Sequence, residues 1–473
     1  MALMLIAGMG GCGKEEPKVF GPVVAGGFYT KDAEALSAQI SEYLDAAEPE
    51  SPKGDVLGFV VPHAGYIYSG PVAAYAYDVI RKRDVKLAVV IAPSHYVRSD
   101  RVAVLDFDRY RTPLGEVPIA RDEIAELIKE DESLFVKDTA FFREEHSMEV
   151  QIPFLQKTAG DFKLLPLVMG NQSRAAAARL ARALHRSLDG NGVIYLASSD
   201  MSHHFPYDTA VRMDRLALEK ISAMDASGLL EDVGRDKSQL CGLGPVLTLM
   251  ELACMKDCCH TTVLKYANSG DTAGPKDAVV GYCTVAFTST LKIGPQEEEE
   301  LVSLARESIR NWMESKKLPD YEPRSEALRA HGAAFVTLKE KGRLRGCIGH
   351  VIAKMPLHRS VQEMAVAAAF DDPRFPPVKR EELPRLTVEI SVMSPLRSVA
   401  EPSEIRIGED GLVIRRGMNS GLLLPQVATE QGWDRDEFLA HACMKANLPA
   451  DAWKTGAEIY AFRAHVFGEE KTD

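Results

Sequence analysis

Five apolar runs of strand length constrain the fold more than any other feature of this chain. They are Val56–Val61, Leu87–Ala92, Leu164–Val168, Val193–Ala197 and Val279–Phe287. Apolar residues follow one another in most of these runs instead of alternating with polar ones, which is typical of strands covered on both faces. Helix-like stretches such as 173–188 lie between the runs. This alternation predicts an α/β fold in which helices flank a mixed or parallel sheet.

Polar clusters that contain histidine follow three of these runs. His63 comes after the first run, His95 after the second, and Asp200 with His203 after the fourth. Ligands bind beyond the carboxyl ends of the strands in open α/β sheets, so parallel neighbours would bring these side chains to one crevice. Cys241, in LCGLGP, is the remaining soft ligand. Imidazole with thiolate favours iron, copper or zinc over magnesium or calcium, and we predict a metal or catalytic site.

Further side chains are assigned to the surroundings of this site. Asp200 and His203 are the expected acid and base groups, which must lie within hydrogen-bond reach of the reacting atoms. His146, in REEHSMEVQIPFL, is interpreted as a helix cap or, preferably, as a residue that orients a ligand. Tyr66 and Tyr68 are expected to line the pocket. The bland alternative is that each histidine is an ordinary polar loop residue, which three matching strand ends disfavour.

A change of pattern divides the chain into two domains. The segment GPQEEEE has the proline and glutamates of a linker and helix start, and apolar residues then recur every four positions from Leu301 to Met313. The alternating strand TVEISVM follows much later. A chain of 473 residues is too long for one ordinary core. We predict a leader at 1–17, a first domain at 18–292, a linker at 293–300 and a second, α+β domain at 301–469.

Composition excludes several classes of protein. The net charge of -12 argues against DNA as a partner and against non-specific nucleic-acid binding. Eight cysteines in a chain of this length do not form a disulfide framework, so most are expected to be reduced thiols. Runs of about 18 apolar residues are absent from the sequence, which predicts that the chain has no membrane-spanning helix.

The first residues, MALMLIAGMGGCGKEEP, leave the localisation open. A match to a phosphate-binding loop is rejected, because Glu15 stands where a serine or threonine belongs and Pro17 disfavours the required helix. The apolar run before Cys12 resembles the end of a lipoprotein signal, although the basic start of such a signal is missing. We expect either a bacterial lipoprotein anchored to the membrane through Cys12 or a cytoplasmic protein with a bland leader.

The second domain contains one candidate catalytic thiol. GRLRGCIGH places Cys347 between Gly346 and Gly349, with Arg343 and Arg345 nearby. Cationic neighbours lower the pKa of a thiol and make it more nucleophilic, so Cys347 is assigned a catalytic role. The alternative is a small thiol packed in a strand beside surface arginines.

Six motifs across nearly the whole first domain occur in the order found in the Memo-like family: VVAGGFYT, PHAGYIYSG, APSHY, EEHSMEVQIPFL, SSDMSH and CGLGP. The chain resembles that family, whose fold is similar to the LigB-like class III extradiol dioxygenases, enzymes that open catechol rings with non-haem iron. The resemblance implies a metal site at His63, His95 and Cys241, with Asp200 and His203 lining the pocket. The dioxygenases use a carboxylate as the third ligand, so Cys241 is a departure, and dioxygenase activity does not follow from the fold.

The second half resembles the AMMECR family through LRGCIGH, DDPRFPPV, LTVEISVMSPL, GLLLPQVATEQGW and NLPADAW. The fusion is similar to the AmmeMemoRadiSam arrangement, in which both families accompany a radical SAM protein. The resemblance therefore implies a radical SAM protein as the partner. It does not imply a reaction.

Three functions remain open. The first is a metal-dependent oxidoreductase similar to the extradiol dioxygenases, with iron as the expected metal and copper or zinc as alternatives. The second is a non-catalytic module that binds a peptide or a metal ion and docks the radical SAM protein. The third is an accessory role in nucleotide or RNA modification.

Overall fold

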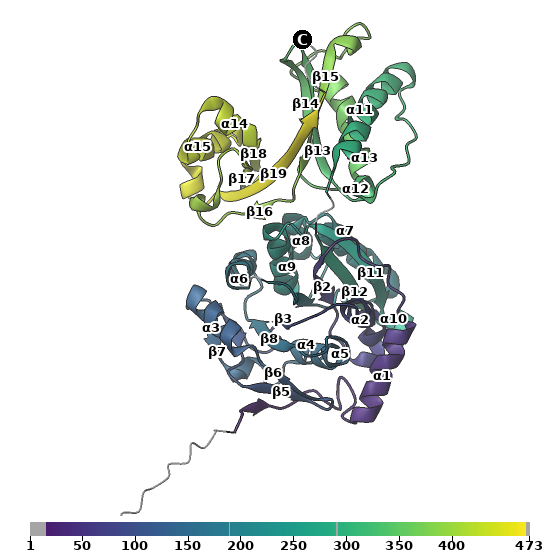
Figure 1. The fold of residues 1–473 in the computed structure, drawn as a ribbon, viewed down its shortest axis with the longest axis vertical. Helices are drawn as coiled ribbons and strands as arrows, with labels where there is room; N and C mark the ends of the chain where they lie inside the picture. The colour runs from purple at the N-terminus through teal and green to yellow at the C-terminus, as the bar shows by residue number, and fades with distance from the viewer. Residues whose placement is uncertain (1–15, 189, 290–291, 470–473) are drawn as a thin grey trace, which may run out of the picture.

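The computed structural model describes residues 16–188, 190–289 and 292–469, which form two parts that lie one above the other (Figure 1). Cys12, the expected site of lipid attachment, lies outside the described residues. Among the residues that are described, no helix has both the length and the apolar composition needed to cross a bilayer.

The first part is built on a mixed sheet. In pairing order its strands are β10 (His203–Phe205), β12 (Val279–Thr288), β2 (Val56–Val61), β9 (Val193–Ser198), β3 (Leu87–Pro93), β8 (Lys163–Met169), β4 (Val102–Val104) and β7 (Phe135–Lys137), with β11 (His260–Asn268) beside β12. The central strands β2, β9, β3 and β8 run parallel, whereas β12 runs antiparallel to β2. The five predicted runs are strands, each within one residue of its expected ends, and the α/β prediction is confirmed.

Helices cover this sheet, which explains why its strands are apolar throughout. Every residue of β3 is buried. The helix α2 packs on β2 and β12, and α1 and α5 pack against α2. The helix α9 packs on β3 and β9, and α6 packs against α9. The helices of the first part are α1 (Ala33–Ala46), α2 (Tyr66–Ile80), α3 (Arg121–Glu130), α4 (His146–Glu149), α5 (Gln151–Thr158), α6 (Arg174–Ser187), α7 (Tyr207–Ser222), α8 (Ala226–Gly234), α9 (Leu243–Met255) and α10 (Ser269–Thr272).

A small second sheet closes one end of the first part. It consists of β1 (Val19–Phe20), β5 (Arg109–Thr112) and β6 (Gly115–Pro118). The buried Glu149 carboxylate connects this region to α4, since it accepts hydrogen bonds from the backbone N–H groups of Val23 and Val24 and from the hydroxyls of Tyr29 and Tyr110. The N-terminal segment is thereby held against the element that begins at His146.

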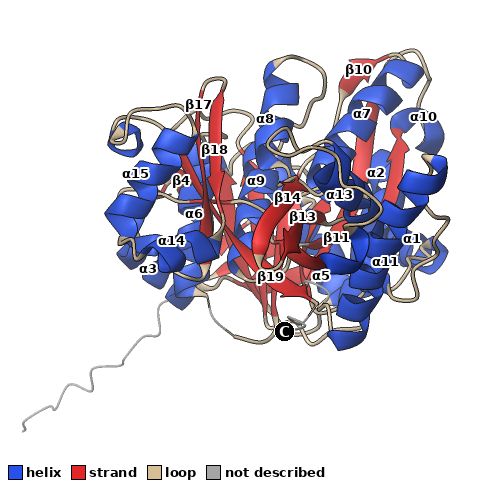
Figure 2. Cartoon of the chain, turned by 90° about the horizontal axis from the view of Figure 1, so that it is seen from above, coloured by secondary structure: helices blue, strands red, loops and turns tan. Residues whose placement is uncertain are grey.

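The second part is an antiparallel sheet with helices beside it, as the predicted α+β domain requires. In pairing order the strands are β14 (Arg343–Gly349), β13 (Ala333–Glu340), β15 (Leu386–Met393), β19 (Glu458–Gly468), β17 (Asp410–Arg416) and β18 (Asn419–Leu423), with β16 (Arg397–Ser398) beside β19. Figure 2 shows α11 and α13 on one side of this sheet, by β13 and β14, and α14 and α15 on the other side, by β17 and β18. The helices are α11 (Pro295–Ser315), α12 (Glu326–Arg329), α13 (Leu357–Phe370), α14 (Pro425–Gln431) and α15 (Arg435–Lys445).

The segment between the two domains is shorter than the linker expected at 293–300. The helix α11 begins at Pro295, with Gly294 at its N-cap and Glu297 accepting a hydrogen bond from the Gly294 N–H. Proline at the first helical position and an acidic first turn are favourable at a helix start. The four glutamates therefore belong to the helix itself.

An ion pair of the first part, between Arg174 and Glu251, also makes hydrogen bonds to the second part. The Arg174 guanidinium donates to the Glu251 carboxylate at 3.2 Å and to the Tyr460 hydroxyl at 3.0 Å, and it lies 4.6 Å from the centroid of the Tyr460 ring. The second oxygen of Glu251 accepts a hydrogen bond from the Ser398 N–H at 3.1 Å. Glu251 is 2% exposed, so this contact is desolvated and fixes how the second part sits on α6 and α9.

Candidate metal centre

Three of the predicted site residues lie at equivalent positions beyond adjacent strands. His63 comes two residues after β2, Asp200 two residues after β9 and His95 two residues after β3. The strands β2, β9 and β3 are neighbours and run parallel, so their carboxyl ends open on the same edge of the sheet. The strand order therefore explains how residues far apart in the sequence reach one edge of the sheet.

Cys241 reaches the same edge of the sheet from the loop before α9. Its N–H donates to the Asp200 carbonyl at 3.2 Å, and its carbonyl accepts a hydrogen bond from the Gln172 side chain at 2.8 Å. The next residue, Gly242, packs directly on the end of β9, where a Cβ atom would lie 2.1 Å from the Ser198 carbonyl oxygen. Only glycine permits this approach, and the approach brings the Cys241 thiol to the histidines.

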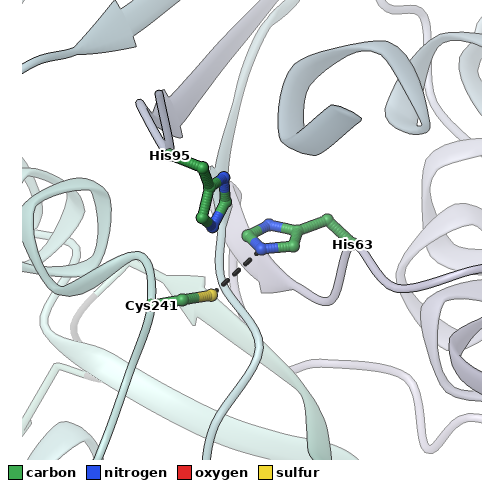
Figure 3. A group of neighbouring side chains, drawn as sticks. All are labelled: His63, His95 and Cys241. Atoms are coloured by element: carbon green, nitrogen blue, oxygen red, sulfur yellow. Dashed lines mark hydrogen bonds between the residues drawn. The ribbon is translucent and has the colours of Figure 1, made fainter. Parts of the chain in front are cut away.

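The side chains of His63, His95 and Cys241 converge on one point (Figure 3). One ligand atom from each lies within 4.8 Å of the other two, and the His63 Nε2 atom is 3.0 Å from the Cys241 Sγ atom. Metal–ligand bonds of about 2.0–2.3 Å place neighbouring ligand atoms roughly 3–4 Å apart, so the spacing suits a single ion. Two imidazoles and a thiolate leave a coordination position open, as catalytic sites require.

A hydrogen bond to Ser198 orients the His63 ring. The His63 Nδ1 atom lies 2.8 Å from the Ser198 Oγ atom, which directs Nε2 toward Cys241. Ser198 in turn donates to the Ser147 carbonyl and accepts from the Gln151 side chain. His63 is 1% exposed, and burial lowers the pKa of its imidazole well below the usual value. The ring is therefore neutral and suited to bind a cation.

The carboxylate of Glu145 holds His95 in place. It lies 2.8 Å from the His95 Nδ1 atom and accepts the His95 backbone N–H at 2.7 Å. Burial raises the pKa of Glu145, but the hydrogen bonds from His95 and Ser147 outweigh it and bring the pKa below the ordinary value. An ionised Glu145 makes Nδ1 the donor and leaves Nε2 of His95 as the free ligand atom. Sequence reasoning missed Glu145, although its place directly before His146 was a signal.

We expect the substitution Glu145→Gln to weaken metal binding by about 10–100-fold while leaving the three ligands in place. The neutral amide cannot enforce the His95 tautomer or raise the basicity of its ring, which is the usual cost of losing such a partner. Metal affinity measured by competition with a chelator checks this. Glu144→Gln is the matched control, since Glu144 is exposed. Equal affinities for the two variants would show that Glu145 has only a structural role.

His146 lies against the ligand His95 and does not cap a helix. Its ring is stacked between Phe28, at 4.4 Å, and His95, at 4.6 Å, measured between ring centroids. The N-cap of α4 is Glu145, so the capping interpretation of His146 is wrong. Burial lowers the pKa of His146 to about 4. Together with His95 and Glu145, His146 forms a second group of atoms that could hold a cation.

Asp200 and His203, the predicted acid and base, lie beside the ligands. Asp200 is 3% exposed and its Oδ1 atom accepts the His63 N–H at 2.7 Å. Burial raises the pKa of Asp200 to about 7 and lowers that of His203. Burial also raises the pKa of the Cys241 thiol, and the nearby Asp200 adds to this effect. A bound cation acts in the opposite sense on a carboxyl and on a thiol that coordinates it.

The two tyrosines expected to line the pocket are in different environments. Tyr68 is 37% exposed. Tyr66 is 3% exposed, and its hydroxyl donates to the Val150 carbonyl, so Tyr66 is a core residue and its assignment to the pocket lining is wrong.

The structure does not bring Cys347 to this site, because Cys347 lies on β14 in the second part. Its thiol accepts a hydrogen bond from the Thr337 hydroxyl at 3.2 Å, and its N–H donates to Asp372 at 2.8 Å. The guanidinium of Arg345, expected to activate the thiol, binds the carboxylate of Glu382 instead. A role for Cys347 therefore has to be separate from the metal centre.

Comparisons with known proteins identify both parts. The model of the Memo-like protein family matches residues 21–286, and the AMMECR1 family model matches residues 302–467. A MEMO1 family protein of Pyrobaculum aerophilum is 39% identical over 56% of this chain and 98% of its own length, and one of Saccharolobus islandicus is 39% identical over 57% and 99%.

Two solved structures of uncharacterized proteins also match. One from Pyrococcus horikoshii is 41% identical, with 38% of this chain and 95% of that chain covered and a TM-score of 0.36. One from Escherichia coli is 14% identical, with a TM-score of 0.31 and coverage of 45% and 91%. The sequence matches carry the assignment. The chain belongs to the Memo-like protein family and bears an AMMECR1 domain in its second half.

Proposed function

We propose that the first part of this protein binds one redox-active metal ion through His63, His95 and Cys241 and acts as a metal-dependent oxidoreductase. The observation that carries the proposal is the convergence of two anchored imidazoles and one thiol on a single point, with their ligand atoms within 4.8 Å of one another. Two imidazoles with a thiolate suit iron, copper or zinc, and iron is the first candidate. When bound, iron or copper would supply Lewis acidity and one-electron chemistry, whereas zinc would supply Lewis acidity alone.

The residues of the chain supply orientation and proton handling. Glu145 and Ser198 fix the two imidazoles, so that each presents its Nε2 atom. Asp200 lies against the backbone of His63, and its raised pKa lets it hold or release a proton near neutral pH in the metal-free protein. His203 and His146 offer neutral imidazoles beside the ligands, since burial lowers the pKa of both. These groups surround the place where a substrate would meet the ion.

A small oxygenated molecule is the proposed substrate class, with dioxygen as the oxidant. In a ring-opening dioxygenase reaction both oxygen atoms enter the product and the substrate supplies all four electrons, so no external reductant is needed. The thiolate in place of a carboxylate ligand changes the charge and potential of the ion, and other oxidations are therefore equally open. The resemblance to the AmmeMemoRadiSam arrangement makes a radical SAM protein the proposed partner.

The proposal is tested by measuring metal content on protein purified without oxygen and without a histidine tag. Iron or copper at close to one ion per chain, followed by oxygen uptake with a catechol panel, is the supporting result. Only zinc, or no metal even after anaerobic reconstitution with ferrous iron, would overturn the redox proposal. The remaining proposal would then be a binding module whose interaction with its partner is insensitive to chelators.

A further inference from the structure

A cavity of about 340 Å³ lies between the two parts of the molecule. One wall consists of residues from the C-terminal half of α6 and the end of α9. The other wall consists of β16, the loop before β17 and part of β19. Its volume is in the range of small-molecule sites, and docking of the two parts creates it.

Guanidinium groups dominate the lining of this cavity. The arginines are Arg182, Arg186, Arg397, Arg406 and Arg463. The carboxylates in the same lining are Asp257 and Glu404. Cations near the C-terminal end of a helix complement its dipole, which accounts for Arg186 in the last turn of α6. It does not account for the arginines that the second part contributes to the same space.

The arginines of the lining differ in how many carboxylate partners they have. Arg406 and Arg463 share one carboxylate, that of Glu409, at 3.4 and 3.5 Å. Two further arginines each have a close carboxylate of their own: Arg397 lies 2.8 Å from Asp410, and Arg186 lies 2.9 Å from Glu130. Arg397 also lies 3.8 Å from Glu404. Direct ion pairs therefore neutralise Arg182 and the pair that shares Glu409 least, while Asp257 and Glu404 of the lining offset the remaining positive charge of the cavity.

Two buried polar atoms of the lining lack hydrogen-bond partners. They are the Nη1 atom of Arg182, from the first part, and the Oε1 atom of Glu404, from the second. Leaving such atoms unpaired is costly, more so when the group is charged. Both side chains line the cavity, where a ligand can supply the missing partners. The first needs an acceptor and the second needs a donor.

We propose that this cavity binds an organic phosphate that carries hydroxyl groups, such as a sugar phosphate or a nucleotide. Phosphate oxygens match the planar donor forks of several arginines at once, and guanidinium groups from α6, β19 and the loop before β17 approach from different directions. A ligand hydroxyl supplies the donor that Glu404 lacks. Because both parts contribute, the ligand also strengthens their docking. The site is separate from the metal centre and does not depend on the proposed redox role.

Calorimetric titration of the metal-free, full-length chain tests the proposal with three probes: ribose 5-phosphate, inorganic phosphate and ribose. Ribose 5-phosphate is expected to bind most tightly, phosphate more weakly and ribose not at all. Arg182→Gln and Arg406→Gln should each weaken binding of ribose 5-phosphate by about tenfold or more, the usual effect of losing a charge-assisted hydrogen bond. Arg215→Gln is the control, because Arg215 is an exposed arginine of α7.

Glu404→Ala, which removes the acceptor, separates the two halves of the proposal. It should weaken binding of ribose 5-phosphate and leave that of inorganic phosphate unchanged or improved. Absence of saturable binding by either phosphate, or equal affinity in wild type and Arg406→Gln, would overturn the site. Arg406 is 66% exposed, so this variant is expected to fold normally. Equal affinities for inorganic phosphate and ribose 5-phosphate would overturn the proposal that the ligand carries hydroxyl groups.

Discussion

Replacing Cys241 by serine is expected to remove the metal ion from the purified protein, with a fall in occupancy of about tenfold or more. A thiolate contributes a full negative charge and a soft sulfur donor. The serine hydroxyl stays protonated near neutral pH and is a poor ligand for iron, copper or zinc. His63→Ala should have the same effect, because it removes a second ligand from the same point. Mass-spectrometric metal analysis after anaerobic reconstitution provides the measurement.

The control for this prediction is Cys347→Ser. Cys347 is also a partly buried thiol, but it lies in the second part, on β14. Its substitution should leave metal occupancy unchanged. Circular dichroism establishes that each variant is folded. Retention of metal in both Cys241→Ser and His63→Ala would refute the assigned ligand set, while loss of metal in Cys347→Ser would refute the independence of the two parts.

The substitution Glu149→Ala is expected to destabilise the first part by about 3 kcal/mol or more. Glu149 is fully buried, and its two oxygens accept four hydrogen bonds at 2.6 to 3.0 Å. Alanine would leave two backbone N–H groups and the hydroxyls of Tyr29 and Tyr110 without their acceptor. A buried donor that loses its acceptor lowers the free energy of unfolding strongly, because no water molecule takes the place of the lost acceptor. Calorimetric melting of the full chain, with the first-part transition followed separately, measures the effect.

Glu144→Ala is the matched control, since Glu144 is an exposed glutamate of the same segment. It should change stability by less than about 0.5 kcal/mol. Tyr110→Phe, which removes a single hydroxyl donor, should cost less than Glu149→Ala. The consequence for the metal centre is indirect: Glu149 holds residues 23–29, and Phe28 of that segment stacks on His146. A loss below about 1 kcal/mol for Glu149→Ala would mean that this anchor is dispensable.

The sequence predicted the strands well because their signal is local. An uninterrupted apolar run such as Leu87–Ala92 indicates burial on both faces, and β3 is buried along its whole length. Its histidine follows at a fixed distance, so the positions of His63 and His95 at strand ends were also readable. The order of the strands could not be predicted, because an apolar run does not show which other run it pairs with. The antiparallel direction of β12 and the early start of α11 became known only from the fold.

By itself, the sequence determined the α/β class of the first domain, the separate second domain and the kinds of side chain available for metal binding. Tertiary structure decided which of those side chains work together. Glu145 meets His95 only because the loop after β3 and the start of α4 are folded against each other. The arginines of the cavity come together only because the two parts are docked against each other. The hydrophobic pattern that predicts a strand or helix depends only on residues close together in the sequence. The hydrogen bond between Glu145 and His95 and the arginine-lined cavity depend on residues that are far apart in the sequence and come together only in the folded chain.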